Sequence, residues 1–203
     1  MERYDFTSDN TSGVHPLVME AIVAANQGYD KSYGGDAGTK DLEARLAELF
    51  EHDLRVFLVP TGTAANALAL AQLVDPWGGI LCHETSHIAE DECGAPEFFT
   101  NGAKLVPLPG AAGKISADAL ELTLALRHQS SPGSCPLQAL SISNATEYGT
   151  CYDVSEVTAI AEVAKHHQLQ VHMDGARFAN AVAHLGCKPA DITWKIGRAS
   201  CRE

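Results

Sequence analysis

A short apolar run that ends in polar residues is the part of this sequence best suited to chemistry. Residues 170–177 begin as a predicted buried strand, with Val171 and Met173 facing a covered sheet. Asp174 and Arg177 follow, where an open α/β sheet presents ligands just past the carboxyl end of a strand. A carboxylate buried there can keep a bound ring nitrogen protonated, because the opposite charges stabilise one another in a low-dielectric pocket. The alternative is that Asp174 is a turn residue and Arg177 its surface ion-pair partner.

A second candidate is the junction between a predicted strand, residues 56–59, and an alanine- and leucine-rich helix that runs to about Leu73. The small residues of the junction leave the first-turn N–H groups of the helix open, where an anion also meets the favourable end of the helix dipole. Gly62 and Thr63 are therefore the predicted phosphate ligands. An ordinary threonine-capped helix after a strand is the alternative.

The sequence also contains a literal H-E-x-x-H, formed by His83, Glu84 and His87. On a helix this arrangement binds zinc and activates water, which makes a zinc hydrolase the rival interpretation. Three observations disfavour it: the motif follows a strand-like run, the intervening threonine and serine are mediocre helix formers, and Glu90 replaces the glycine that metzincins require. We therefore predict no metal site.

Predicted strands and helices alternate along the chain. The strands lie near 56–59, 79–82, 104–107, 137–143 and 170–173, and the main helices near 17–25, 39–50, 116–126 and 154–167. Such alternation is typical of an α/β fold, with a mainly parallel sheet and helices on both faces.

Composition narrows the partners and the compartment. The chain of 203 residues carries 26 acidic and 14 basic residues, a net charge of −12, and has no basic block interleaved with aromatics, so nucleic acid is not expected as a partner. The first ten residues do not resemble a secretion signal, and no run is long enough to span a membrane. Six cysteines are scattered without a C-x-x-C pair, unlike a disulfide framework. We expect a cytoplasmic protein without a membrane partner.

Together these segments resemble fold-type-I pyridoxal-phosphate enzymes, and most closely the low-specificity threonine aldolases of the aromatic β-eliminating lyase group. The resemblance covers residues 6–195. It implies pyridoxal 5′-phosphate as cofactor and cleavage of threonine and related β-hydroxy-α-amino acids to glycine and an aldehyde. Another fold-type-I lyase or a transaminase is the alternative.

The resemblance implies a catalytic role for three residues. Asp174 would keep the pyridine nitrogen protonated so that the ring accepts electrons. Arg177 would hydrogen-bond the phenolic oxygen of the cofactor or the carboxylate of the substrate. His87 would stack on the ring and assist proton transfer.

Further positions follow from the same resemblance. Gly62 and Thr63 match the phosphate loop of the family, and Ser8 matches a residue that helps to hold the substrate carboxylate. Residues 146–147 lie in a loop that borders the cofactor. Residues 33–36 match a stretch that approaches the site of a neighbouring subunit, which implies a homo-oligomer, a dimer or a tetramer.

The lysine that holds the cofactor as a Schiff base has no clear counterpart. It should follow Asp174 by a further strand and a small-residue turn, and the last candidate, Lys195, sits in what resembles the helix before that strand. After Lys195 the likeness stops, and residues 196–203 resemble the translation of a sequencing adapter.

We therefore expect residues 1–13 to form an N-terminal arm and residues 14–195 a partial PLP-binding large domain. Residues 196–203 would be a non-native tail, and the C-terminal small domain would be absent. On this interpretation the chain of 203 residues has no aldolase turnover and binds the cofactor weakly and non-covalently at most.

Overall fold

The computed structural model describes residues 11–128 and 133–193. It divides into two compact units, Met1–Leu42 and Glu43–Glu203. Ser8, Lys195 and the tail at 196–203 lie outside the described residues. The predicted boundaries of the arm, the large domain and the tail remain predictions.

Two helices account for most of the regular structure near the N-terminus. Helix α1 (Pro16–Ala25) begins after His15, whose Nδ1 accepts a hydrogen bond from Leu17 N at 3.3 Å. Helix α2 (Ala37–Phe50) starts in the first unit, ends in the second, and extends the predicted helix by two residues. Just before α2, the Asp36 carboxylate accepts bonds of 2.7 Å from both N and Oγ1 of Thr39, and these bonds lower the pKa of Asp36.

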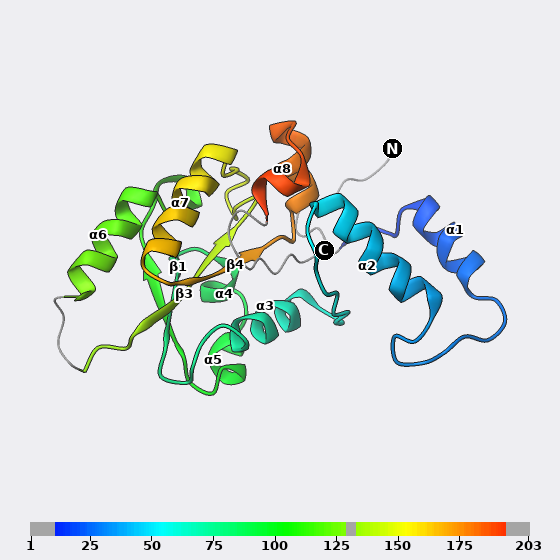
Figure 1. Ribbon diagram of the computed structural model, residues 1–203, viewed down its shortest axis with the longest axis horizontal. Coiled ribbons are helices and arrows are strands. Elements are labelled where there is room, and N and C mark those ends of the chain that lie inside the picture. Colours follow the sequence, from blue (N-terminus) through cyan, green and yellow to red (C-terminus); the bar gives the residue numbers. More distant parts are fainter. Residues whose placement is uncertain (1–10, 129–132, 194–203) are drawn as a thin grey trace. The chain divides into compact units, whose positions relative to one another are not determined.

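The second unit is built on a four-stranded parallel sheet (Figure 1). Its strands are β1 (Gly79–His83), β2 (Lys104–Leu108), β3 (Leu137–Ser143) and β4 (Gln170–Asp174), in the order β2-β1-β3-β4. In the register of β3 and β4, Ser143 is paired with Asp174, so both strands end at the same edge of the sheet.

Helices cover both faces of this sheet, as predicted (Figure 1). Because successive side chains in a strand point to opposite faces, Leu81 packs with one set of helices and its neighbours Ile80 and Cys82 with another. The first set is α6 (Ala117–His128), α7 (Val154–His166) and α8 (Phe178–Leu185). The second includes α3 (Gly62–Ala71) and α4 (His87–Glu90); the short helix α5 (Ala95–Phe99) and the 3₁₀ turns η2 (Ala111–Gly113) and η3 (Pro189–Ile192) complete the unit.

Helix α7 delivers the chain to β4, and its sequence explains its position. Asp153 caps its first turn, accepting from Glu156 N at 2.9 Å, while the Glu156 side chain accepts from Asp153 N at 2.9 Å. The residues that face the sheet recur at helical spacing and are buried: Val157, Ile160, Ala161 and Ala164. The predicted inward face of this helix is confirmed.

The predicted strand at residues 56–59 is wrong. These residues have no regular secondary structure, and Phe57 and Leu58 are 83% and 74% exposed. A strand is stable only when a neighbour pairs with its backbone N–H and C=O groups, and none of the described strands pairs with this segment. The apolar run alone could not reveal that missing neighbour.

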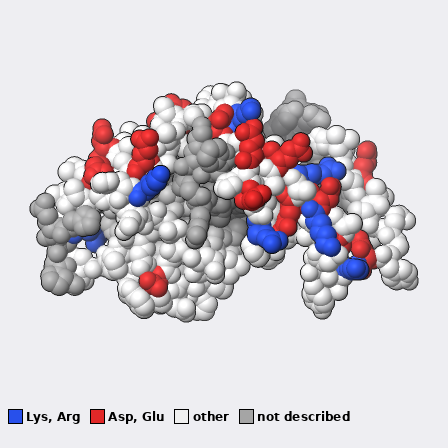
Figure 2. Space-filling view, viewed as in Figure 1, with Lys and Arg blue, Asp and Glu red and all other residues white. Residues whose placement is uncertain are grey.

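Surface charge, thiols and helix length complete the description. On the face drawn in Figure 2, lysine and arginine side chains are interspersed with acidic ones.

The five described cysteines, Cys82, Cys93, Cys135, Cys151 and Cys187, are free. Among residues 11–128 and 133–193, no helix has the length and apolar character needed to cross a membrane.

Candidate functional site

Asp174 is the last residue of β4 and is 3% exposed. Its Oδ1 accepts a hydrogen bond from Ala176 N at 3.0 Å, and its Oδ2 accepts one from Asn66 Nδ2 at 2.9 Å. The alternative of a surface turn residue is therefore wrong, because the carboxylate is buried and accepts a hydrogen bond from a side chain of helix α3. A buried carboxylate at a strand end is suited to face a cationic group.

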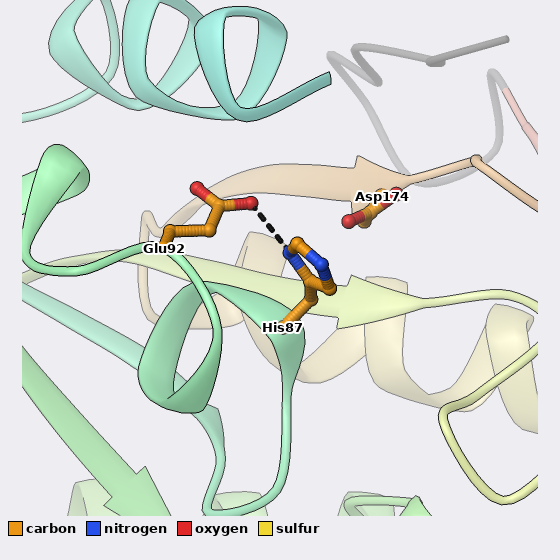
Figure 3. A group of neighbouring side chains, drawn as sticks. All are labelled: His87, Glu92 and Asp174. Carbon is orange, nitrogen blue, oxygen red and sulfur yellow. Dashed lines mark hydrogen bonds and ion pairs between the residues drawn. The ribbon is translucent and has the colours of Figure 1, made fainter. Parts of the chain in front are cut away.

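His87 and Glu92 lie beside Asp174 (Figure 3). His87 is the first residue of α4, and its Nδ1 is 2.8 Å from Glu92 Oε1. The Glu92 side chain is fully buried, whereas 33% of the His87 side chain is exposed. One polar atom from each of the three residues lies within 4.8 Å of the other two. The structure thus brings together two residues that the sequence predicted, and adds Glu92, which it did not.

Asn66 connects the two carboxylates. Its Nδ2 donates to Glu92 Oε1 at 2.7 Å and to Asp174 Oδ2 at 2.9 Å, one contact for each of its hydrogens. Since both neighbours accept hydrogen bonds, the nitrogen rather than the oxygen of the amide faces them. Asn66 is fully buried in the alanine-rich helix α3. A polar residue on the apolar face of that helix was the one signal in the sequence that could have revealed it.

Arg177 follows β4 and is held by the loop after β3. Its Nη2 is 3.3 Å from Glu147 Oε1, and its Nε donates to the Ala145 carbonyl at 3.2 Å. Glu147 Oε1 also accepts from Ser143 Oγ at 2.9 Å and from His87 N at 3.2 Å. Glu147 Oε1 therefore contacts both the Arg177 guanidinium and the backbone N–H of His87 at the start of α4, so one carboxylate positions these two predicted residues.

Thr146, the other candidate in this loop, forms hydrogen bonds that stabilise the loop. Its Oγ1 is 2.8 Å from Thr150 Oγ1, and the Thr150 hydroxyl donates to the Ala112 carbonyl at 2.7 Å. Thr146 is buried at 1% exposure. These contacts fix the path of the chain.

The predicted phosphate loop is the start of α3. Thr61 is the N-cap, and its Oγ1 accepts from Ala64 N at 3.1 Å. The amides of Gly62 and Thr63 donate in none of the hydrogen bonds found among the described residues, as is usual in the first turn of a helix. One turn later, Asn66 binds Asp174, so this helix start lies at the same edge of the sheet as the buried carboxylate. The capped-helix alternative and the anion-site prediction are compatible here.

The H-E-x-x-H motif does not form a zinc site of the zincin kind. His83 ends β1 and His87 begins α4, so the two rings are not one turn apart on a single helix. Both ring nitrogens of His83 have partners, with Nδ1 2.9 Å from Thr85 Oγ1 and Nε2 3.1 Å from the Gly110 carbonyl, and Glu84 is exposed. This geometry contradicts the zinc hydrolase alternative.

Within the described part of the chain, His87, Glu92 and Asp174 form the one group with three possible metal ligands. The amide nitrogen of Asn66, however, donates to both carboxylates. A hydrogen-bond donor facing these oxygens takes the place that a cation would need. The group is therefore suited to hold the His87 ring and the Asp174 carboxylate in fixed orientations.

Comparison with known proteins agrees with this arrangement. A family model described as beta-eliminating lyase matches residues 5–197. The chain belongs to this family. It is 43% identical over 192 residues to the low specificity L-threonine aldolase of Pseudomonas aeruginosa, covering 95% of this chain and 55% of that protein. It is 32% identical to the alanine racemase TOXG of Cochliobolus carbonum, covering 89% of this chain and 46% of that protein.

A solved structure of Leishmania major threonine aldolase superposes with a TM-score of 0.85 at 30% identity, covering 94% of this chain and 55% of that one. The predicted fold class is thereby confirmed. The chain spans about half the length of the curated relatives it matches.

The beta-eliminating lyase family uses pyridoxal phosphate, so membership confirms the predicted cofactor. The described residues fit it: a buried carboxylate at the end of β4 for a ring nitrogen, and open amides at the start of α3 for a phosphate. Among the described lysines, Lys31, Lys40, Lys104, Lys165 and Lys188 are exposed and Lys114 binds Glu156 at 2.6 Å.

Proposed function

We propose that this chain is part of a pyridoxal-phosphate-dependent aldehyde-lyase. Its substrates would be threonine and related β-hydroxy-α-amino acids, which it would cleave between Cα and Cβ to give glycine and an aldehyde. The observation that carries the proposal is that His87 lies beside the buried Asp174 and Asn66 in a chain that is 43% identical to a low specificity L-threonine aldolase.

When bound, the cofactor supplies an electron sink for the electrons of the Cα–Cβ bond. Asp174 would hold a proton at the ring nitrogen, because a buried carboxylate stabilises a cationic partner. The first-turn amides of Gly62 and Thr63 would hold the phosphate at the other end. These residues bind and orient, and the protein gains catalytic power from their fixed charges.

Proton transfer would fall to His87. Cleavage requires that the β-hydroxyl lose its proton and that Cα later gain one, and an imidazole can do both near neutral pH. A third of its side chain is exposed beside Asp174, which supports this role. Arg177, 30% exposed and anchored by Glu147, would bind the substrate carboxylate or the phenolic oxygen of the cofactor. Ser8 would assist at the carboxylate.

The similarity to a protein named as an alanine racemase favours a second candidate, another reaction of the same cofactor at the same residues. A racemase, a lyase and a transaminase would all need the ring-nitrogen partner and the phosphate site, and would differ in the contacts to the substrate side chain. A panel of threonine, allo-threonine, serine and alanine, followed by aldehyde release and by chiral analysis, separates these reactions.

We also propose that the enzyme is a cytoplasmic homo-oligomer and that a lysine holds its cofactor as a Schiff base. Tyr33, in the stretch that resembles a subunit-contacting loop of the family, is fully exposed, as a residue that reaches another subunit would be in a single chain. Light scattering of the purified protein measures the subunit number. Peptide mapping after borohydride reduction with bound cofactor locates the lysine.

The decisive experiment measures aldehyde release from threonine by the intact enzyme, of which this chain would be a part, carrying Asp174→Ala. We expect turnover to fall by about 10²–10³-fold, because the proton on the ring nitrogen loses its buried counter-charge. Asp153→Ala is the matched control, since Asp153 only caps α7; it should lower stability by about 1 kcal/mol and leave turnover per folded molecule unchanged. Wild-type turnover in Asp174→Ala would remove Asp174 from the mechanism.

A further inference from the structure

The two ring nitrogens of His87 have different surroundings. Nδ1 is 2.8 Å from Glu92 Oε1, and a carboxylate oxygen can only accept in such a contact unless it is itself protonated. Nε2 takes part in none of the hydrogen bonds found among the described residues. Of the two neutral tautomers of the imidazole, the contact therefore selects the one in which Nδ1 carries the proton and Nε2 has the lone pair.

We propose that Glu92 is a positioning residue that fixes His87 in the Nδ1–H tautomer, so that Nε2 is the nitrogen that takes and returns the proton at the substrate. The proton transfer at the substrate rests on the proposed function, whereas the tautomer of His87 follows from the geometry of the Glu92–His87 pair.

Glu92 is built to hold one orientation. Its side chain is fully buried, and its carbonyl accepts a hydrogen bond from Ala95 N at 2.9 Å, at the turn that starts α5. Asn66 Nδ2 donates to the same Oε1 that faces His87, at 2.7 Å. An oxygen that already accepts from an amide on one side faces the imidazole as an acceptor on the other, so the direction of the Nδ1 contact is determined.

Asn66 extends this order to Asp174. Two carboxylates within 4.8 Å of each other in a buried site repel, and a neutral amide that donates to both reduces that repulsion without adding a charge. The residue thereby presents Asp174 and Glu92 on either side of the imidazole, as Figure 3 shows. Asp174 accepts the Asn66 bond through Oδ2, and Glu92 contacts the histidine through Oε1.

The test is long-range ¹H–¹⁵N NMR of the histidine rings in the protein without cofactor, recorded over a pH series and assigned through His87→Gln. The neutral ring of His87 should carry its proton on Nδ1. Glu92→Gln should keep this tautomer, because its amide oxygen can still accept from both Asn66 and His87. Glu92→Leu should lose it and show mainly the Nε2–H form that free imidazole side chains prefer.

A wild-type ring with the proton on Nε2 overturns the proposal, as does an unchanged tautomer in a folded Glu92→Leu protein. The wild-type spectrum decides the matter even if the leucine variant does not fold. This readout needs neither cofactor nor turnover, so an enzyme without aldolase activity but with an Nδ1–H ring would refute the proposed function and leave this inference standing.

In the active enzyme the same variants give a second readout. Because Glu92 acts through His87, Glu92→Gln should lower kcat by about 10-fold and Glu92→Leu by about 100-fold, with KM changed little. A role in packing alone would instead lower the yield of folded protein and leave kcat per folded molecule unchanged. Equal kcat in wild type and a folded Glu92→Leu would contradict the positioning role.

Discussion

Two histidines four residues apart occupy opposite roles at the edge of the sheet. His83, at the end of β1, is 4% exposed, and both of its ring nitrogens have partners, Thr85 Oγ1 and the Gly110 carbonyl. His87, at the start of α4, has one nitrogen fixed by Glu92 and presents a third of its side chain to solvent. A histidine whose hydrogen-bonding capacity is used up stabilises the fold, whereas one with a single fixed nitrogen can act on a ligand.

The strongest way to break this comparison is to remove the ring of His87. We expect His87→Ala to lower kcat/KM for threonine cleavage by about 10²-fold or more, the usual contribution of a general acid–base group. Its unfolding free energy should change by less than about 1 kcal/mol, because the side chain is partly exposed and Asn66 Nδ2 still donates to the Glu92 oxygen that the ring contacts. Aldehyde release and urea unfolding measure the two effects.

His83→Ala is the matched variant and should give the reverse result. Loss of its buried ring removes the contacts with Thr85 Oγ1 and the Gly110 carbonyl and leaves a cavity, which costs about 1–3 kcal/mol of stability. Turnover per folded molecule should stay within a few-fold of wild type. Equal losses of activity in the two variants would contradict the division of roles.

A third test asks whether the remaining buried polar groups of the unit serve the fold alone. Tyr152 is 1% exposed, and its hydroxyl oxygen accepts from Ile115 N at 2.6 Å. Tyr152→Phe leaves that amide unpaired and should lower the unfolding free energy by about 1–2 kcal/mol without changing kcat. A change in kcat at unchanged stability would extend the site beyond the edge of the sheet.

The smallest expected effect concerns Cys82, next to His83 in β1. Burial raises the pKa of the Cys82 thiol from 9.0 to about 11, so the folded protein binds this proton more tightly than the unfolded chain does. Stability should therefore be fully present below pH 9.0 and fall by on the order of 1 kcal/mol as the pH rises towards 11. Cys82→Ala should flatten this part of the curve in urea titrations; an unchanged slope would show that the thiol is not its source.

Much of the sheet could be predicted from local patterns. Strands β3 and β4 end where polar residues interrupt apolar runs, and this pattern predicted that Asp174 and Glu147 follow strand ends at one edge of the sheet. The inward face of α7 followed from helical spacing. Residues 56–59 share the same apolar character but have no paired neighbour, a property that depends on the rest of the sheet and not on the run itself.

The polar network could not be read from the sequence. Asn66 lies 26 residues from Glu92 and 108 from Asp174, so only the folded sheet brings the three together. Glu92 sits in an acidic stretch that by composition predicts a solvated turn. The family resemblance supplied His87 and Asp174, and the side-chain contacts supplied their partners.

Helix α3 fixes the distance between two parts of the candidate site. The amides of Gly62 and Thr63 lie at its N-terminus. One turn further along, about 6 Å down the helix axis, Asn66 forms a hydrogen bond with Asp174. If this helix shifted along its axis, the Gly62 and Thr63 amides and the Asn66 side chain would move together, and the distance between them would stay the same. Under the proposed function, a ligand would need an anionic group and a basic ring nitrogen separated by a distance that matches this spacing.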